Sequence, residues 1–219
     1  MNTLLPNRTE AGKLLALKLA NYANRSDVLV LALPRGGVPV AFEIAKALNL
    51  PLDVFLVRKL GTPRSKELAM GAIALGGVRV INQDIIEWQQ LSPRDLEEVT
   101  AREQQELERR DLLYRGDRPF PDVQNRTIIL VDDGIATGAT LRAAILGLKQ
   151  QQVASIVVAV PVACLSICDE LEREVDRVVC LIKSENLHSI SLWYEDFSQT
   201  TDEEVRDLLA KSQSFVLQN

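Results

Sequence analysis

The sequence is poor in the residues that build metal centres and disulfide frameworks. Only three cysteines and one histidine, His188, occur among its 219 residues, which argues against a His/Cys metal site and a disulfide scaffold. We expect Cys164, Cys168 and Cys180 to be buried, reduced thiols, with oxidation sensing as the alternative. No apolar run approaches the roughly 18 residues that a membrane helix needs.

Positive charge is also scarce. The formal net charge of -5 and the pI near 5.1 argue against a general nucleic-acid binder, which draws affinity from clustered Lys and Arg. Pro6, Arg8 and Glu10 interrupt the first residues, which lack the apolar core of a signal peptide. We therefore expect a cytoplasmic protein with neither a nucleic-acid nor a membrane partner.

The pattern of apolar runs indicates the fold class. With 47% hydrophobic and 25% charged residues, the chain is long enough for one α/β domain with embellishments. Apolar runs near residues 30, 55, 130, 157 and 180 alternate with helical patterns, which predicts a mostly parallel sheet flanked by helices. We expect one domain over 1–219, with a helical insertion at 82–120 and a C-terminal hood and helix at 184–219.

The predicted insertion follows a hairpin and consists mainly of one charged helix. Gly76 and Gly77 supply the tight turn of a hairpin over 72–81. Ser92 and Pro93 then begin a helix that ends near Tyr114. Pairs four residues apart, Glu98 with Arg102 and Glu106 with Arg110, support a largely exposed helix. It is either a surface helix packed along one edge or a subunit contact, as in a homodimer.

The stretch TIILVDDGIATGATL, residues 127–141, carries the clearest chemical signal. Its apolar run is typical of a strand buried on both faces, and Asp132 and Asp133 must then lie at the carboxyl end of the sheet, where α/β folds bind ligands. The small residues and hydroxyls that follow lead into a helix, whose free N–H groups bind anions. The loop comprises Gly134, Ile135, Ala136, Thr137, Gly138, Ala139 and Thr140.

The loop suits one phosphate, because the Gly-x-x-x-x-Gly-Lys-Ser/Thr loop and Gly-x-Gly-x-x-Gly are both absent. Two carboxylates suit vicinal hydroxyls or a metal, so a ribose 5-phosphate fits the whole. An ordinary strand-turn-helix with a polar edge is the alternative. VDDGIATGAT resembles the phosphoribosyl-diphosphate motif of type I phosphoribosyltransferases, which have a Rossmann-like core. The resemblance implies that Asp132 and Asp133 hold the ribose hydroxyls and that Ala136 to Thr140 hold the 5-phosphate.

A second turn of the same kind follows the strand predicted at 28–33. Its residues Pro34, Arg35, Gly36 and Gly37 combine glycine N–H groups with a fixed cation, which makes either an anion-binding turn or a tight turn with a surface arginine. The turn resembles the family's pyrophosphate loop. From the resemblance we expect a cis peptide between Arg35 and Gly36.

Four cations occur in residues 58–67, after a strand predicted at 52–57. They form either a solvated loop or, by resemblance to the family, a mobile lid over the diphosphate. Arg58 and Lys59, followed by Gly61, are similar to the Arg-Lys-x-Gly segment of adenine phosphoribosyltransferases. Glu67 in this loop is a candidate substrate contact and acid/base group.

Aromatic residues concentrate just beyond the last predicted strand. Trp193 and Tyr194 either pack or, as the hood of the family implies, stack on a planar acceptor, and Glu195 is the other candidate acid/base group. The 6-oxopurine enzymes of the family carry an aspartate where this chain has Ala136, so hypoxanthine and guanine are disfavoured as acceptors.

The resemblance implies a magnesium-dependent transfer of ribose 5-phosphate from phosphoribosyl diphosphate to a nucleobase-like acceptor. Catalysis then consists mainly of neutralising the diphosphate. The candidate catalytic residues are Arg35, Arg58, Lys59, Asp132 and Asp133, and the two aspartates meet Mg2+ through substrate hydroxyls or water. A non-catalytic sensor of the same ligand is the rival hypothesis, and phosphoester hydrolysis is a third.

Overall fold

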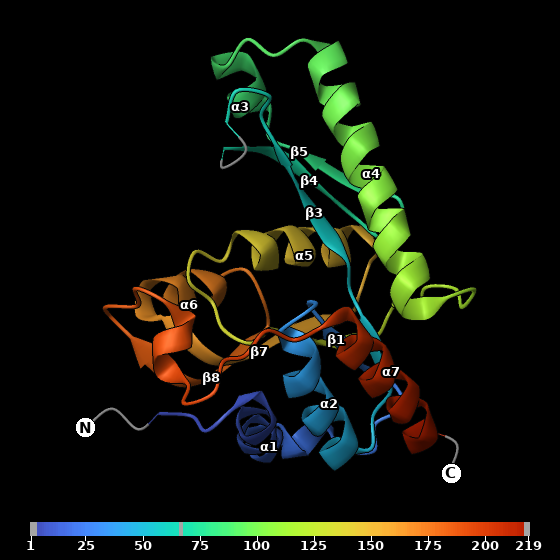
Figure 1. Ribbon diagram of the computed structural model, residues 1–219, viewed down its shortest axis with the longest axis vertical. Helices are drawn as coiled ribbons and strands as arrows, with labels where there is room; N and C mark the ends of the chain where they lie inside the picture. Colours follow the sequence, from blue (N-terminus) through green and yellow to red (C-terminus); the bar gives the residue numbers. More distant parts are fainter. Residues whose placement is uncertain (1–3, 66–67, 217–219) are drawn as a thin grey trace.

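Five parallel strands form the central sheet of the computed structural model, which describes residues 4–65 and 68–216 (Figure 1). The strand order is β2-β1-β6-β7-β8, and all four neighbouring pairs are parallel. The strands are β1 (Val28–Ala32), β2 (Leu52–Val54), β6 (Thr127–Val131), β7 (Ser155–Cys164) and β8 (Arg177–Ser184). The sequence-based prediction of a mostly parallel α/β sheet is confirmed.

Helices cover both faces of this sheet (Figure 1), which explains why every residue of β1 and β6 is buried. Successive strand residues face opposite sides, so Ile129 packs in one apolar cluster and Ile128 in the other. Helices α1 (Arg8–Lys18), α2 (Gly37–Leu48) and α7 (Asp202–Val216) contribute to the first cluster. Helices α5 (Ala139–Gln150) and α6 (Leu165–Leu171) contribute to the second.

A smaller antiparallel sheet, β3-β4-β5, projects away from the central sheet beside α5 (Figure 1). It comprises β3 (Val57–Gly61), β4 (Ala69–Ala74) and β5 (Val78–Ile81), and the expected hairpin turns at Gly76 and Gly77, whose φ angles are +82° and +76°. Helix α3 (Gln83–Trp88) and the long α4 (Pro93–Arg115) follow, and α4 packs against β3 and β4. Short 3-10 helices occur at η1 (Ala20–Tyr22) and η2 (Ile190–Trp193).

Three local predictions need correction. By residue type Thr9 is a plausible N-cap for the first helix, but the N-cap of α1 is Asn7, whose side chain accepts from the Glu10 N–H. The strand expected at 52–57 divides into β2 and β3, because the chain leaves the central sheet after Val54 and enters the smaller one at Val57.

The third correction concerns the ion pairs along α4. The expected pair of Glu106 with Arg110 is present at 2.7 Å. Glu98 instead pairs with Arg94, and Arg102 turns to Glu103. The exposed helix face offers each carboxylate a cation on either side, so spacing alone does not fix the partner.

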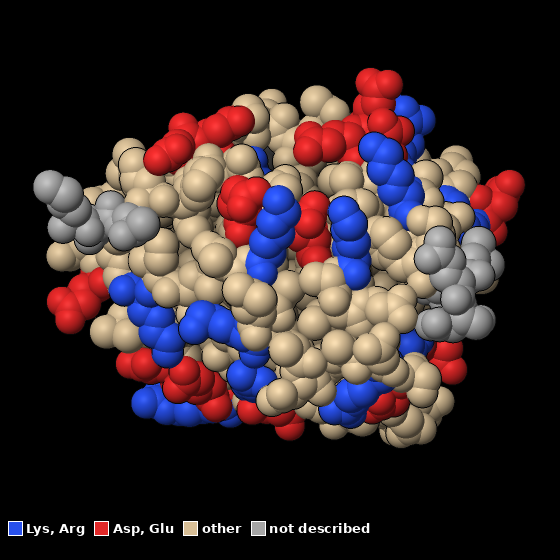
Figure 2. All heavy atoms as spheres, turned by 90° about the horizontal axis from the view of Figure 1, so that it is seen from below, with Lys and Arg blue, Asp and Glu red and all other residues tan. Residues whose placement is uncertain are grey.

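The surface carries both charges, and the thiols are free. On the face seen from below, Lys and Arg lie interspersed with Asp and Glu (Figure 2), so this face presents no broad basic surface of the kind that duplex DNA requires. Cys168 is buried, and Cys164 and Cys180 are half-buried free thiols. Within residues 4–65 and 68–216, no helix combines the length and hydropathy needed to cross a bilayer.

Strand order brings the two predicted anion-binding turns together. After β1 the chain adds β2 on one side, whereas after β6 it adds β7 and β8 on the other, so β1 and β6 lie side by side at the point where the winding reverses. The Leu33 N–H donates to the Val131 carbonyl at 2.8 Å, which fixes the two strand ends against each other. Ligands of open α/β sheets bind at such a switch point.

Candidate active site

Two half-buried carboxylates follow β6, at the edge of the sheet where the motif placed them. The Asp133 backbone N–H donates to the Asp132 carboxylate at 2.9 Å. Arg8, from α1, holds the Asp133 carboxylate: its Nε and Nη2 atoms lie 2.9 and 2.8 Å from Oδ2. The Arg8 and Asp133 side chains are only 11% and 15% exposed, so water screens this ion pair less than a surface pair.

Arg8 is anchored by the C-terminal part of the chain. Its Nη1 atom donates to the Ser198 carbonyl at 2.7 Å, and its guanidinium carbon lies 3.8 Å from the centre of the Phe197 ring. Sequence reasoning missed Arg8 as a site residue. It lies 125 positions from Asp133, and a salt bridge between such distant residues has no signature in spacing.

The surroundings of the acid pair shift the pKa of Asp132. Burial raises the pKa of Asp132 well above its ordinary value, and the adjacent charge of Asp133 raises it further. Arg8 acts in the opposite direction. A bound cation, or ligand hydroxyls that donate to the carboxylates, would stabilise the charged form of Asp132 and lower its pKa again.

The loop after the acids forms a small cavity at the start of α5. The cavity has a volume of about 120 Å³ and is lined by Asp132 and by the loop from Gly134 to Leu141. Gly138, the N-cap of α5, has a φ of +72°, which favours glycine. The first turn of a helix leaves N–H groups without intrahelical partners, so the cavity has the donors that a phosphate needs. Ala136, Thr137, Ala139 and Thr140 are exposed there.

The turn after β1 touches the acid pair through its glycines. A Cβ on Gly36 would lie 1.8 Å from Asp133 Oδ2, and one on Gly37 would lie 2.7 Å from the Val131 carbonyl oxygen. Only glycine therefore permits this approach without displacing a neighbour. Arg35 lies in the same turn, with Nη1 3.7 Å from Oδ1 of Asp202 in α7, and Asp202 also accepts from the Tyr114 hydroxyl at 2.5 Å.

The expected cis peptide lies one residue earlier than predicted. It joins Pro34 to Arg35, rather than Arg35 to Gly36. Gly36 already has right-handed helical angles, φ -62° and ψ -28°, as the residue before α2. The Gly37 N–H donates to the Leu33 carbonyl at 3.1 Å, so the chain has entered the helix by this point.

The prediction that Arg58 and Lys59 lie in a loop is wrong. Arg58 and Lys59 belong to β3 and are half-buried, rather than lying in a loop, because both pair with residues of β4. Arg58 donates through Nε and Nη2 to Oε2 of Glu103 in α4, at 3.0 and 2.6 Å. Glu67, the candidate substrate contact, lies outside the described residues.

The aromatic segment around Tyr194 packs against the backbone of the acid pair. Tyr194 is 5% exposed, packs on Phe197 with ring centres 5.0 Å apart, and donates from its hydroxyl to the Asp133 carbonyl at 2.8 Å. This position leaves it no open face for stacking, contrary to the expectation for a hood. Trp193 is half-buried and Glu195 is exposed.

Two turns with free N–H groups and an acid pair meet at one switch point of an α/β sheet, an arrangement that suits a sugar phosphate. Comparison with known proteins identifies the family. Residues 3–195 match the family model described as the phosphoribosyl transferase domain. The chain therefore belongs to the phosphoribosyl transferase domain family, a family of transferases, and the resemblance seen in VDDGIATGAT is confirmed.

Relatives and solved structures support this assignment. A Mycobacterium tuberculosis protein whose name places it provisionally among the phosphoribosyl transferases is 42% identical over 202 residues, which are 92% of this chain and 45% of that protein. The chain thus spans less than half the length of this relative. The crystal structure of TT1426 from Thermus thermophilus is similar with a TM-score of 0.84 and 38% identity, covering 95% of this chain and 98% of the other. The AQ2163 protein from Aquifex aeolicus shares the fold, with a TM-score of 0.50 and 11% identity over 83% of this chain and 77% of that one.

Proposed function

We propose that the chain transfers ribose 5-phosphate from phosphoribosyl diphosphate to an acceptor and releases diphosphate. One observation carries this proposal: the acid pair, whose Asp132 lines the phosphate-sized cavity after β6, directly contacts the glycine turn after β1. Two carboxylates that suit hydroxyls therefore lie between two turns whose N–H groups suit anions. That order matches the order of groups along the donor, which has a 5-phosphate, a diol and a diphosphate.

Each part of the site receives a role under this proposal. Asp132 and Asp133 accept hydrogen bonds from the ribose hydroxyls, and the loop 134–140 binds the 5-phosphate. Arg35 and the N–H groups of Gly36 and Gly37 bind the diphosphate, whose developing charge is the main obstacle to the reaction. Asp202 lies next to Arg35, so diphosphate would compete with this carboxylate for the guanidinium.

Magnesium fits the site as an ion held chiefly by the substrate. No group of three or more His, Cys, Asp and Glu side chains able to hold a metal occurs among residues 4–65 and 68–216. Asp132 and Asp133 alone make an incomplete oxygen shell, which phosphate oxygens, hydroxyls and water would complete, as Mg2+ prefers. When bound, the ion would neutralise diphosphate charge.

Few of the described residues bear on the identity of the acceptor. Trp193 is the remaining aromatic candidate for contact with a planar, nucleobase-like acceptor, and Glu195 is the remaining described candidate for proton transfer. Ala136 offers no acid/base group within the phosphate loop. We therefore keep the proposed acceptor class broad.

Titration calorimetry with phosphoribosyl diphosphate, with and without Mg2+, tests the proposal. The wild type is expected to bind in a magnesium-dependent manner, and the variant Asp132→Asn with Asp133→Asn is expected not to bind. Asp117→Asn with Asp169→Asn, a matched pair of exposed aspartates, serves as the control. A wild type that does not bind millimolar donor would contradict the proposal.

The rival hypothesis, a non-catalytic sensor, predicts donor binding without turnover. A panel of nucleobase-like acceptors, with released diphosphate as the readout, separates the two. A transferase is expected to lose turnover far more than donor affinity when Arg58 and Lys59 are replaced by alanine. Donor binding without diphosphate release across the panel would favour the sensor.

A further inference from the structure

A large cavity lies beside the two anion-binding turns, between β3, α4 and the first turn of α5. We name it the β3–α4 cavity. Its volume is about 560 Å³, within the range of small-molecule sites. It is lined by Pro34, Val57, Arg58, Lys59, Gly61, Arg102, Glu103, Arg110, Thr140 and Ala143. Pro34 belongs to the turn after β1 and Thr140 to the phosphate loop, so the cavity opens beside the proposed diphosphate position.

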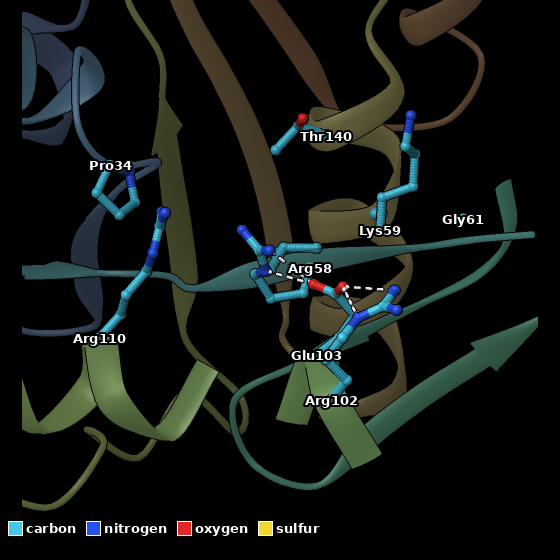
Figure 3. A pocket seen from close by; sticks show the side chains of 10 residues that line it. Pro34, Arg58, Lys59, Gly61, Arg102, Glu103, Arg110 and Thr140 are labelled. Atoms are coloured by element: carbon cyan, nitrogen blue, oxygen red, sulfur yellow. Dashed lines mark hydrogen bonds and ion pairs between the residues drawn. The ribbon is translucent and has the colours of Figure 1, made fainter. Parts of the chain in front are cut away.

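The lining of this cavity is strongly basic. Four of the ten residues are Lys or Arg, and Glu103 is the one acid, which leaves a formal charge of +3. Arg58 and Arg102 converge on Glu103 in Figure 3, with Nη2–oxygen distances of 2.6 and 3.2 Å. A guanidinium has five N–H donors, and the bonds to Glu103 use two on each arginine, so both arginines keep donors for a ligand.

The helical insertion supplies half of these cations. Arg102 and Arg110 lie on α4, eight positions apart, and therefore on the same face of the helix. Figure 3 shows Arg110 beside Pro34, with Thr140 and Lys59 across the cavity. Arg110 donates from Nε to Glu106 at 2.7 Å. No aromatic ring is among the ten lining residues, so the cavity suits an oxyanion better than a flat base.

We propose that Arg102 and Arg110 of α4 bind the diphosphate group of the donor in the β3–α4 cavity. The proposal rests on the proposed function, because it assigns further residues to the same ligand. It makes α4 a substrate-binding element: the helix contributes two of the cations that neutralise the leaving group. The ribose 5-phosphate part of the donor is bound elsewhere, at the loop after β6.

The chain contains a matched control. Arg109 and Arg110 are neighbours that both donate to Glu106 at 2.7 Å, yet only Arg110 lines the cavity. Arg94 likewise pairs along α4, with Glu98, and does not line the cavity. Arg102→Gln with Arg110→Gln can thus be compared with Arg94→Gln with Arg109→Gln, which removes the same charge from the same helix.

Calorimetric titration with three probes tests the assignment: inorganic diphosphate with Mg2+, phosphoribosyl diphosphate and ribose 5-phosphate. Arg110→Gln is expected to lower the affinity for inorganic diphosphate and for phosphoribosyl diphosphate by about 10-fold, because a hydrogen bond to a charged group is lost. Arg102→Gln with Arg110→Gln is expected to lower both affinities further, because two such bonds are lost. Affinity for ribose 5-phosphate and all affinities of the control pair should stay within about twofold of the wild type.

Equal effects of Arg110→Gln and Arg109→Gln would overturn the proposal, and so would an equal loss of affinity for ribose 5-phosphate. Circular dichroism and the thermal midpoint establish that each variant is folded. A wild type that binds inorganic diphosphate but not the donor would defeat the proposed function while leaving this oxyanion site in place. The two failures are therefore distinguishable.

Discussion

Replacing Gly36 with alanine tests whether the position of the Asp133 carboxylate governs donor binding. The backbone at Gly36 has φ -62° and ψ -28°, which alanine adopts without strain. The new methyl group, however, would lie 1.8 Å from Asp133 Oδ2, whereas ordinary contact begins at 3.4 Å. The carboxylate, or the start of α2, must then move by the difference, about 1.6 Å.

A displacement of this size breaks the bonds from Arg8, which now measure 2.8 and 2.9 Å. Each lost hydrogen bond between charged groups costs on the order of 1.5 to 3 kcal/mol of stability, and the cost is smaller where water forms a new hydrogen bond to the exposed groups. The displaced carboxylate also loses its hydrogen bond to a ligand hydroxyl, which costs about 1.5 to 3 kcal/mol, or roughly 10- to 150-fold in affinity. We therefore expect Gly36→Ala to fold, to lose about 2 kcal/mol of unfolding free energy, and to bind the donor about 100-fold more weakly.

Urea denaturation and donor titration measure the two effects, and a double-mutant cycle with Asp133→Ala identifies their cause. Once the carboxylate is absent, the methyl group at position 36 should cost little more, so the two substitutions should be strongly non-additive. Gly77→Ala is the control for donor affinity alone, because its Cβ would meet nothing within 4 Å, whereas its φ of +76° makes alanine costly to stability. Additive losses, or a donor affinity unchanged by Gly36→Ala, would refute the reasoning.

Two further substitutions test buried polar contacts distant from the acid pair. Arg115, with a fully buried side chain, lies 3.7 Å from Asp53, and burial raises the Asp53 pKa above its ordinary value. Arg115→Met should cost about 3 to 5 kcal/mol at pH 7 by leaving that charge unpaired. Because a raised folded-state pKa favours the folded protein as pH falls, the cost should shrink at pH 4 to 5 in urea denaturation; a loss independent of pH would contradict this. Burial and the bond to Asp202 raise the pKa of Tyr114 to about 12, and burial also raises the pKa of Tyr194. Absorbance titration should therefore show both phenols ionising late, and the late absorbance change should fall, without vanishing, in Tyr114→Phe. That variant should lose about 1 kcal/mol, because water can replace the hydroxyl at the half-exposed carboxylate.

Much of the fold was accessible to sequence reasoning because its elements are set by local chemistry. The apolar run before Asp132 is typical of a strand covered on both sides, and Ser92 with Pro93 is a typical start of a helix. The capping box of Ser92 and Asp95 confirms that start. The glycine pair at 76–77 likewise determined a tight turn through its positive φ angles.

The sequence by itself also determined the chemistry of the site: two acids at a strand end, a loop of small residues after them, and a second turn rich in glycine. Only the tertiary structure decided which strands are neighbours, and so that the two turns meet. It alone brought Arg8 to Asp133 and placed Arg58 in a strand facing Glu103. The physical reason is that backbone propensity and capping act within a few residues. Ion pairs between distant segments depend instead on how whole helices and strands pack, and residue spacing carries no record of that packing.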